Sequence, residues 1–318
     1  MLKSKSRIRY LASTLLVGVS LLATVTNGAH AGYGAGKSWN VSGSAGFQYD
    51  DNVTTDEIDS TSNLSDTAAV IEASGSYRPD AGKDFGLQLS YDFSQSLYQD
   101  LSSFDLQSHL FSGSVEKEIN GFDVGLNYLY GRTFLGGDDF LSLNSITPTL
   151  GYSVTDSWYV SLRYNYQNKD FISSSNDGRD AGLNSGTIDN FLFFMDSKAY
   201  LSFGYQAEDE NTDSDEFDYF GHIFHVRLKL PVSVGGLEAF NPVLNAGVKY
   251  SDKDYSSVTS SIGAEREDER TTLNLGLDAD LSRHVFAKFD YEYINAQSNL
   301  ASSDFTENIV TISIGARF

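Results

Sequence analysis

The chain has 318 residues, no cysteine and a formal net charge of −21 at pH 7. The absence of cysteine excludes a disulfide framework and thiolate metal sites, and a strongly acidic chain lacks the basic patches that nucleic-acid binding requires. Beyond the N-terminus no apolar run approaches the roughly 20 residues of a membrane-spanning helix. Neither a helical membrane protein nor a nucleic-acid-binding protein is therefore expected.

The N-terminal sequence predicts a secretory signal peptide over residues 1–31. Basic residues at positions 3, 5, 7 and 9 precede a short apolar run over 11–23. Ala29-His30-Ala31 then supplies the small-x-small pattern of a cleavage site. We expect this leader to be removed on export and residues 32–318 to form one domain.

From Trp39 onward, apolar and polar side chains alternate in successive segments. This period of two predicts strands with one apolar and one polar face. The predicted strands are 39–51, 68–78, 85–94, 104–116, 122–133, 144–154, 158–167, 185–195, 198–208, 220–230, 241–250, 271–281, 285–293 and 305–318. The pattern does not fix the facing of strand 104–116, and Pro148 weakens the ladder of strand 144–154.

The strand pattern predicts an all-β fold, a transmembrane antiparallel β-barrel of about 14 strands. Short turns such as Asn120-Gly121 alternate with long polar loops predicted over 52–67, 172–184, 209–218 and 251–270. The segments suit tilted membrane-spanning strands of roughly 9–11 residues, and only closure satisfies sheet edges in lipid. A polar face in strand after strand favours a lumen over the dry core of a soluble sandwich. We expect short periplasmic turns, long acidic extracellular loops and location in the cell outer membrane.

The last strand has apolar residues at alternate positions up to a terminal aromatic residue. They are Val310, Ile312, Ile314, Ala316 and Phe318. This pattern resembles the closing strand of bacterial outer-membrane proteins, which the barrel assembly machinery recognises. The resemblance implies that this machinery is a partner during insertion and that outer-membrane lipid and lipopolysaccharide surround the barrel.

A narrower resemblance covers most of the chain. The opening over 46–53 (Gly-Phe-Gln-Tyr-Asp-Asp-Asn-Val), Tyr291-Glu292-Tyr293, Ser298-Asn299 and the closing strand 305–318 resemble the C-terminal barrel of surface lipoprotein assembly modifiers (Slam). This resemblance implies a barrel of fourteen strands and a secreted lipoprotein as partner. We expect the chain to lack the helical repeat domain that precedes the barrel in that family, because few residues separate Ala31 from the first strand.

The polar faces predict a lumen lined by charges of both signs. The acidic candidates are Asp50, Glu72, Asp92, Asp123, Asp278, Asp280, Asp290, Glu292 and Glu307, and the basic candidates are Arg78, Arg163, Arg227, Lys229, Lys249, Lys288 and Arg317. This mixture suits either a water-filled pore with a transverse field or a set of salt bridges that fills the barrel. Segments 172–184 and 251–270 are the predicted candidates for a loop that folds inward.

Metal and catalytic chemistry have weak signals. Acids or Asn alternate at Asp209, Asn211, Asp213 and Asp215 as in a calcium loop, but the glycine at the sixth position and the final bidentate Glu are missing. A solvated acidic loop is the favoured interpretation, and a loose divalent site is the alternative. His222 and His225 have an odd spacing, which places them on opposite faces of a strand.

No motif around the candidate bases His109 and His225 resembles a barrel enzyme, so we predict no enzymatic activity, no catalytic residue and no cofactor. The favoured function is an outer-membrane channel for passive transport of small solutes, with a cation preference from the acidic loops. The alternatives are a secretion or assembly factor for a surface protein or lipoprotein, and a structural or surface-binding barrel with a filled lumen.

Overall fold

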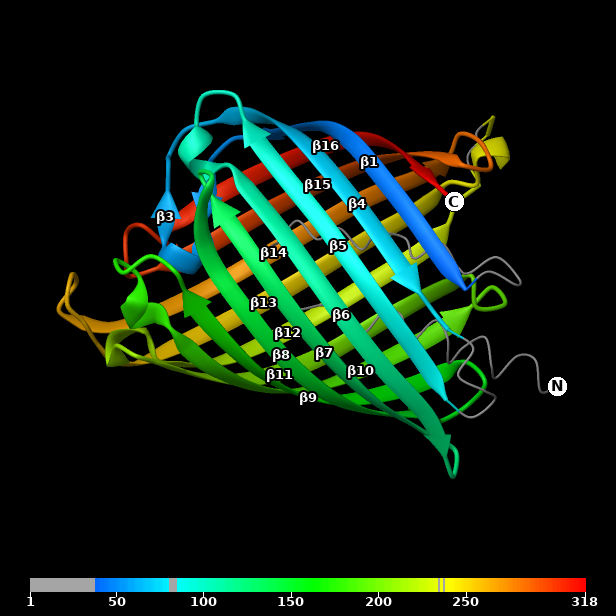
Figure 1. Ribbon diagram of the computed structural model, residues 1–318, viewed down its shortest axis with the longest axis horizontal. Coiled ribbons are helices and arrows are strands. Elements are labelled where there is room, and N and C mark those ends of the chain that lie inside the picture. Colours follow the sequence, from blue (N-terminus) through cyan, green and yellow to red (C-terminus); the bar gives the residue numbers. More distant parts are fainter. Residues whose placement is uncertain (1–37, 80–84, 234, 237) are drawn as a thin grey trace.

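The computed structural model describes residues 38–79, 85–233, 235–236 and 238–318. Within them the chain forms a closed antiparallel barrel whose strands follow one another in chain order, and the last strand pairs with the first (Figure 1). The barrel has fourteen strands, as predicted. The predicted signal peptide over 1–31 lies outside the described residues, and so do residues 80–84 between the second and third barrel strands.

The barrel strands are β1 Trp39–Asp50, β4 Asp66–Tyr77, β5 Gly86–Tyr98, β6 Leu106–Ile119, β7 Phe122–Leu135, β8 Asp138–Ser153, β9 Trp158–Phe171, β10 Ala181–Phe194, β11 Ala199–Thr212, β12 Tyr219–Pro231, β13 Val243–Thr259, β14 Ala264–Asp280, β15 Val285–Ser298 and β16 Phe305–Arg317. The connections contain β2 Thr54–Thr55, η1 Asp56–Ile58, β3 Ser60–Thr61, η2 Ser102–Phe104, η3 Asp177–Arg179, η4 Asp215–Phe217 and η5 Glu238–Phe240. In the part of the chain that the structure describes, no helix has the length and apolar character needed to cross a membrane.

The two ends of the barrel differ in their connections. We call the end that carries the β1–β4, β9–β10 and β15–β16 connections the loop end, and the opposite end the turn end. The turn end holds the Asn120-Gly121 hairpin between β6 and β7, where Asn120 has φ 52° and Gly121 has φ 88°. These left-handed conformations are those of a type I′ turn, which matches the twist of the strands that it joins.

The strands at the loop end are longer than predicted. The predicted loop 251–270 is wrong, because β13 and β14 pair across most of it and only residues 260–263 connect them. Strands β8 and β10 likewise begin at Asp138 and Ala181, ahead of the predicted starts. At this end of the barrel both faces of a strand carry polar side chains, so the alternation that marks a membrane strand is lost although the backbone ladder continues.

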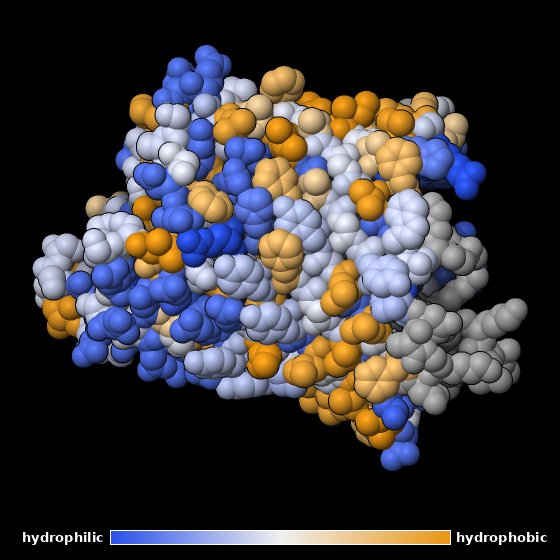
Figure 2. Space-filling view, viewed as in Figure 1, coloured by the Kyte–Doolittle hydropathy of each residue, from blue (hydrophilic) through white to orange (hydrophobic). Residues whose placement is uncertain are grey.

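Apolar residues of the alternating pattern face outward. Phe47 in β1 and Ile312 in β16 are 71% and 61% exposed, while their neighbours Gln48 and Ser313 are buried. The facing of β6, left open by the sequence, follows from exposed Phe111 and buried Ser108. Figure 2 shows hydrophilic side chains gathered towards the loop end of the face in view and hydrophobic ones over much of the remainder.

Pro148 lies on the outward face of β8, where the β8–β9 ladder stops at Ile146 and resumes at Thr149. Proline has no N–H to donate, so the sequence locates this break in the ladder correctly. The break does not end the strand, because β8 stays paired with β7 through Pro148.

Gly151 in β8 lies beneath the ring of Tyr159, which packs with Phe191 and Phe193 in an inward cluster. A Cβ at this position would overlap the Tyr159 hydroxyl. We therefore expect Gly151→Ala to displace the ring and to cost about 1–3 kcal/mol, the usual penalty of overpacking. Urea unfolding of the refolded protein measures this cost. Gly186→Ala in β10 is the matched control, because open space surrounds its Cβ position, and equal losses in both variants would contradict the argument.

Candidate functional site

The connection between β1 and β4, residues 51–65, folds over the mouth of the barrel at the loop end; we call it the inward loop. Its strands β2 and β3 pair with each other, and η1 lies at its tip (Figure 1). Val53 donates its N–H to the carbonyl of Leu64 at 3.1 Å and accepts from Ser62 at 2.9 Å. The inward loop is therefore a hydrogen-bonded hairpin with a defined conformation.

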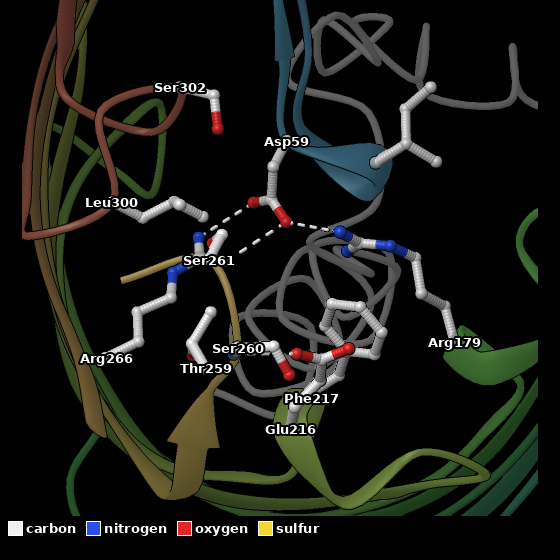
Figure 3. A pocket seen from close by; sticks show the side chains of 11 residues that line it. Asp59, Arg179, Glu216, Phe217, Thr259, Ser260, Ser261, Arg266, Leu300 and Ser302 are labelled. Atoms are coloured by element: carbon white, nitrogen blue, oxygen red, sulfur yellow. Dashed lines mark hydrogen bonds and ion pairs between the residues drawn. The ribbon is translucent and has the colours of Figure 1, made fainter. Parts of the chain in front are cut away.

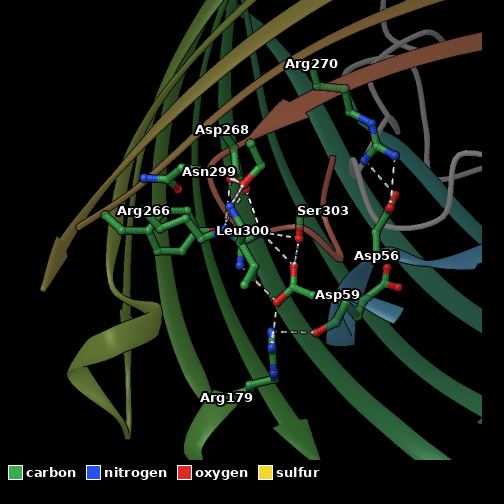
Figure 4. Close-up of polar contacts among 12 residues, drawn as sticks. Asp56, Asp59, Arg179, Arg266, Asp268, Arg270, Asn299, Leu300 and Ser303 are labelled. Carbon is green, nitrogen blue, oxygen red and sulfur yellow. Dashed lines mark hydrogen bonds and ion pairs between the residues drawn. The ribbon is translucent and has the colours of Figure 1, made fainter. Parts of the chain in front are cut away.

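Asp59, which follows η1, is the main polar contact of the inward loop. Arg266 of β14 donates to both of its carboxylate oxygens at 2.7 and 3.0 Å, and Arg179 of η3 donates to one at 2.6 Å (Figure 4). Ser303, between β15 and β16, adds a hydrogen bond of 3.0 Å. Asp59 has φ 51°, a left-handed conformation that aspartate adopts more readily than most residues. One carboxylate thus joins the inward loop to three other parts of the chain.

Asp56 makes the second charged contact of the inward loop. Arg270 of β14 donates to its two oxygens at 2.7 and 2.9 Å, a bidentate geometry that planar guanidinium groups favour. Nearer the barrel wall, the Thr54 hydroxyl donates to Glu307 of β16 at 3.1 Å. The polar side of the inward loop is therefore bound to β14 and β16.

Ile58 makes an apolar contact at the tip of the inward loop. It packs against the cluster formed by Phe140, Leu141, Leu143 and Phe171, which belongs to β8 and β9. Because β8 and β9 lie far around the barrel from β14 and β16, the inward loop crosses the mouth and is held on both sides. The segment that crosses the mouth follows the first strand and is not among the predicted candidates. Of those candidates, 251–270 is wrong because β13 and β14 pair across most of it, whereas 172–184 contributes Arg179 to the contact with Asp59.

A cavity of about 340 Å³ lies beside the contact of Asp59 with Arg179 and Arg266 (Figure 3). Asp59, Arg179 and Arg266 line it, together with Glu216 and Phe217 of η4. Glu216 accepts a hydrogen bond from the N–H of Ser260 at 3.2 Å, which ties η4 to the β13–β14 hairpin. The arginines that bind the inward loop are thus next to open space at the mouth.

The charges around η1 determine how the inward loop responds to acid. We call its bound conformation, in which Asp56 and Asp59 contact the arginines, the closed loop. Burial would raise the pKa of Asp59, but hydrogen bonds and charge from Arg266 and Arg179 lower it to about 2, against an ordinary value of 3.8. Burial raises the pKa of Glu57, and the neighbouring charge of Asp56 acts in the same direction. Asp59 therefore favours the closed loop in its ionised form, and Glu57 favours it in its protonated form.

These opposite signs predict a closed loop that withstands moderate acid. The Asp59 contribution, roughly 2 kcal/mol, is fully present above the ordinary aspartate pKa of 3.8 and is lost as pH falls through about 2. As the pH falls, protonation of Glu57 also stabilises the closed loop. We expect the closed fraction, measured as bilayer conductance, to be undiminished between pH 7 and pH 5 and to fall only below about pH 4. Opening between pH 7 and 5 would contradict this account.

The structure places the predicted lumen charges on the inward face of the wall. These residues are Asp50, Glu72, Arg78, Asp92, Asp123, Arg163, Arg227, Lys229, Lys249, Asp278, Asp280, Lys288, Asp290, Glu292, Glu307 and Arg317. Several form pairs: Arg163 with Asp189 at 2.7 Å, Lys288 with Glu72 at 3.7 Å, and Arg317 with Asp280. Their role as pore-lining residues stays a prediction.

The two signs of charge are unevenly distributed over the inner wall. Acids occupy neighbouring strands from β15 through β16 and β1 to β5, and they are Asp290, Glu292, Glu307, Asp50, Glu72 and Asp92. Bases are grouped on β12 and β13 as Arg227, Lys229 and Lys249, for which the described residues supply no ion-pair partner. Lys288 of β15 and Arg317 of β16 lie among these acids, so the separation of the two signs is partial. The transverse field stays a prediction.

The histidines lie as their spacing predicts. His222 faces outward and bonds the Tyr205 hydroxyl at 2.7 Å, whereas His225 faces inward and bonds Asp189 at 2.7 Å. His109 also faces outward, where it bonds the Tyr91 hydroxyl at 2.8 Å.

The predicted divalent candidates do not form a single loop. Asp209 and Asn211 belong to β11, Asp213 follows that strand and Asp215 begins η4. Among the described residues no group of three or more His, Cys, Asp or Glu side chains is arranged to hold a metal ion.

Sequence reasoning missed the residues that hold the inward loop, namely Asp56, Asp59, Arg179, Arg266 and Arg270. Two signals were present. Arg266 and Arg270 have an even spacing and so share a face of β14, and they are basic residues in an otherwise acidic segment, Ala264–Arg270. Such a pair on a lumen face needs acidic partners, and the Asp56-Glu57-Ile58-Asp59 segment supplies them.

Comparison with known proteins identifies the family. The sequence model of the family described as surface lipoprotein assembly modifier matches residues 39–318, from the first residue of β1 to the C-terminus. The chain belongs to this family. The match spans every barrel strand of this surface lipoprotein assembly modifier and confirms the resemblance noted in its sequence. None of the curated proteins matches the chain.

Solved structures share the barrel architecture at low sequence identity. They include a loop-deletion mutant of OmpT, an outer membrane protein of Vibrio cholerae (TM-score 0.50, 10% identity, 89% of this chain and 100% of that chain). An anion-selective porin from Comamonas acidovorans has a TM-score of 0.47 and 11% identity, over 88% of this chain and 98% of that chain. OccAB3 from Acinetobacter baumannii has a TM-score of 0.46 and 8% identity, over 88% of this chain and 99% of that chain. The likeness concerns the fold alone. The chain is an outer-membrane β-barrel.

Proposed function

We propose that this barrel is a gated conduit that assists a surface lipoprotein across the outer membrane, with the loop end outside and the turn end in the periplasm. Family membership over 39–318 carries the proposal. The inward loop supports it, because a bound hairpin that crosses the mouth suits a conduit that opens for a partner. In this proposal the acidic connections of the loop end face the medium.

The proposal is tested on the bacterial surface. We compare a strain that lacks the protein with the same strain carrying it, and we identify by mass spectrometry the lipoproteins that external protease removes from intact cells. The expected result is that at least one lipoprotein becomes protected while its total amount is unchanged, and that the intact gene restores exposure. An unchanged set of exposed lipoproteins would overturn the proposal.

A second candidate is a passive channel for small solutes with a cation preference. The acidic strip of the lumen, which runs from β15 to β5 and includes Glu72, Asp92 and Asp290, favours it, because carboxylates attract cations. Single-channel recording under a salt gradient separates the two candidates. Steady cation-selective steps from the native protein favour the channel, and silence from a folded, heat-modifiable protein favours the closed conduit.

A further inference from the structure

Three arginines converge on the inward loop, and we call them the arginine site: Arg179, Arg266 and Arg270. Each guanidinium lies over an aromatic ring: Arg179 over Phe217 at 4.0 Å, Arg266 over Tyr255 at 4.6 Å, and Arg270 over Phe305 at 5.5 Å. None of these rings belongs to the inward loop. The stacking therefore positions the arginines whether or not the loop is bound.

Arg266 has a further support that is independent of the inward loop. Asp268, two residues along the same face of β14, accepts from its Nε at 2.9 Å and from its Nη2 at 2.6 Å. Asp268 in turn accepts from the Ser298 hydroxyl of β15 at 2.6 Å. One edge of the guanidinium is fixed in this way, and another edge is presented to the ligand, which is Asp59.

The ligand of the arginine site is a short acidic peptide from the same chain. Its carboxylates, Asp56 and Asp59, stand three residues apart, and the Glu57 carbonyl also accepts from Arg179 at 3.2 Å. Ile58 between them occupies the apolar cluster of β8 and β9. The two acidic residues of the loop thus contact arginines, and the apolar residue between them contacts an apolar cluster.

The arginine site borders the cavity at the mouth, so another chain can reach it. Arg179 and Arg266 contribute to the lining of this cavity, with Ser260 and Ser261 of the β13–β14 connection (Figure 3). Arg179 and Arg266 are the cationic residues of this lining, which also contains Glu216. An acidic segment that entered here would meet the arginines already used by Asp59.

We propose that the arginine site binds an acidic segment of the polypeptide that uses the conduit, and that the inward loop occupies this site as an internal substitute until such a segment displaces it. The proposal rests on the proposed function for the origin of the segment. Its chemistry requires carboxylates about three residues apart with an apolar residue between them. Binding of the segment and release of the inward loop are then one exchange of ligands.

The test uses the refolded full barrel and a fluorescent peptide with the sequence of residues 52–65. The double variant D56N/D59N leaves the arginines without the charges of their internal ligand, and fluorescence anisotropy measures peptide binding to it. We expect this variant to bind the peptide at least tenfold more tightly than the native protein does. We also expect at least tenfold preference over a peptide with Asn, Gln and Asn at the positions of Asp56, Glu57 and Asp59.

Adding Arg266→Gln to the double variant should remove at least tenfold of the affinity. Arg179→Gln, outside the barrel strands, provides the same comparison if the first change prevents folding. Equal binding of acidic and neutral peptides, or no binding by a folded, heat-modifiable variant, would overturn the proposal. Binding of lipopolysaccharide in place of the peptide would overturn the assignment to a polypeptide. The surface-exposure experiment has a separate readout, so failure of this proposal and failure of the proposed function are distinguishable.

Discussion

The D56N/D59N variant is expected to convert a closed barrel into a conducting one. Asparagine keeps the size of each side chain and removes the charge that Arg179, Arg266 and Arg270 hold at 2.6–2.7 Å. A hydrogen bond to a charged group contributes about 1.5–3 kcal/mol, and about 1.4 kcal/mol changes an equilibrium tenfold. Loss of even half of these contacts therefore shifts the balance between closed and open loop by more than tenfold.

Single-channel recording in a planar bilayer checks this expectation. The native barrel should be closed for most of the record, and the double variant should show steps of several-fold larger mean conductance. Asp139→Asn is the matched control, because its ion pair with Arg132, 3.0 Å long, is largely exposed and includes no residue of the inward loop. A double variant as silent as the native protein would show that the inward loop is not what closes the lumen.

The sequence predicts the membrane-embedded half of this molecule well and its loop end poorly. Within the membrane, lipid outside and polar surroundings inside force side chains to alternate, so Phe47 and Gln48 already reveal their faces. Outside the membrane both faces of a strand contact water, so the alternation of apolar and polar side chains disappears. Strands β13 and β14 continue there because backbone hydrogen bonds pair them, which side-chain polarity does not report.

The inward loop is hidden from the sequence for a related reason. Residues 52–65 are polar and short, as in any solvated connection, and their conformation depends on partners that follow more than one hundred residues later, Arg179 and Arg266. In the sequence, only the opposite charges of the aspartates and arginines indicate that the inward loop contacts these residues. The apolar partner of Ile58 is equally distant, since β8 and β9 build the cluster that receives it. Long-range pairs of this kind are decided by barrel closure.

Barrel closure also explains why one short loop reaches both walls. The ladder joins β1 to β16 and to β4, so the inward loop starts beside Glu307 and ends where β4 begins. From that position its tip meets β14 on one side and the β8–β9 cluster on the other. In the proposed conduit, opening breaks the contacts of this one segment only, and its ion pairs with Arg179, Arg266 and Arg270 are those that an acidic chain is proposed to replace.

A charge on the outward face of the closing strand should destabilise the barrel far more than the same charge on the inward face. Ile312 is 61% exposed on the side that faces lipid, whereas its neighbour Thr311 faces the lumen opposite Asp290 of β15. Arginine near the bilayer midplane costs about 2–4 kcal/mol. We therefore expect Ile312→Arg to lose that amount of folding free energy in urea titrations in lipid vesicles.

Thr311→Arg tests the same segment with the same side chain on the opposite face. Its guanidinium would stand beside Asp290 on the acidic part of the inner wall, so the expected change stays below about 1 kcal/mol, as for screened ion pairs. The fraction of heat-modifiable protein recovered from outer membranes should follow the same order, with Ile312→Arg depleted and Thr311→Arg near the native level. Similar losses in both variants would mean that the strand is disturbed by size alone, and a larger loss for Thr311→Arg would contradict the assignment of its faces.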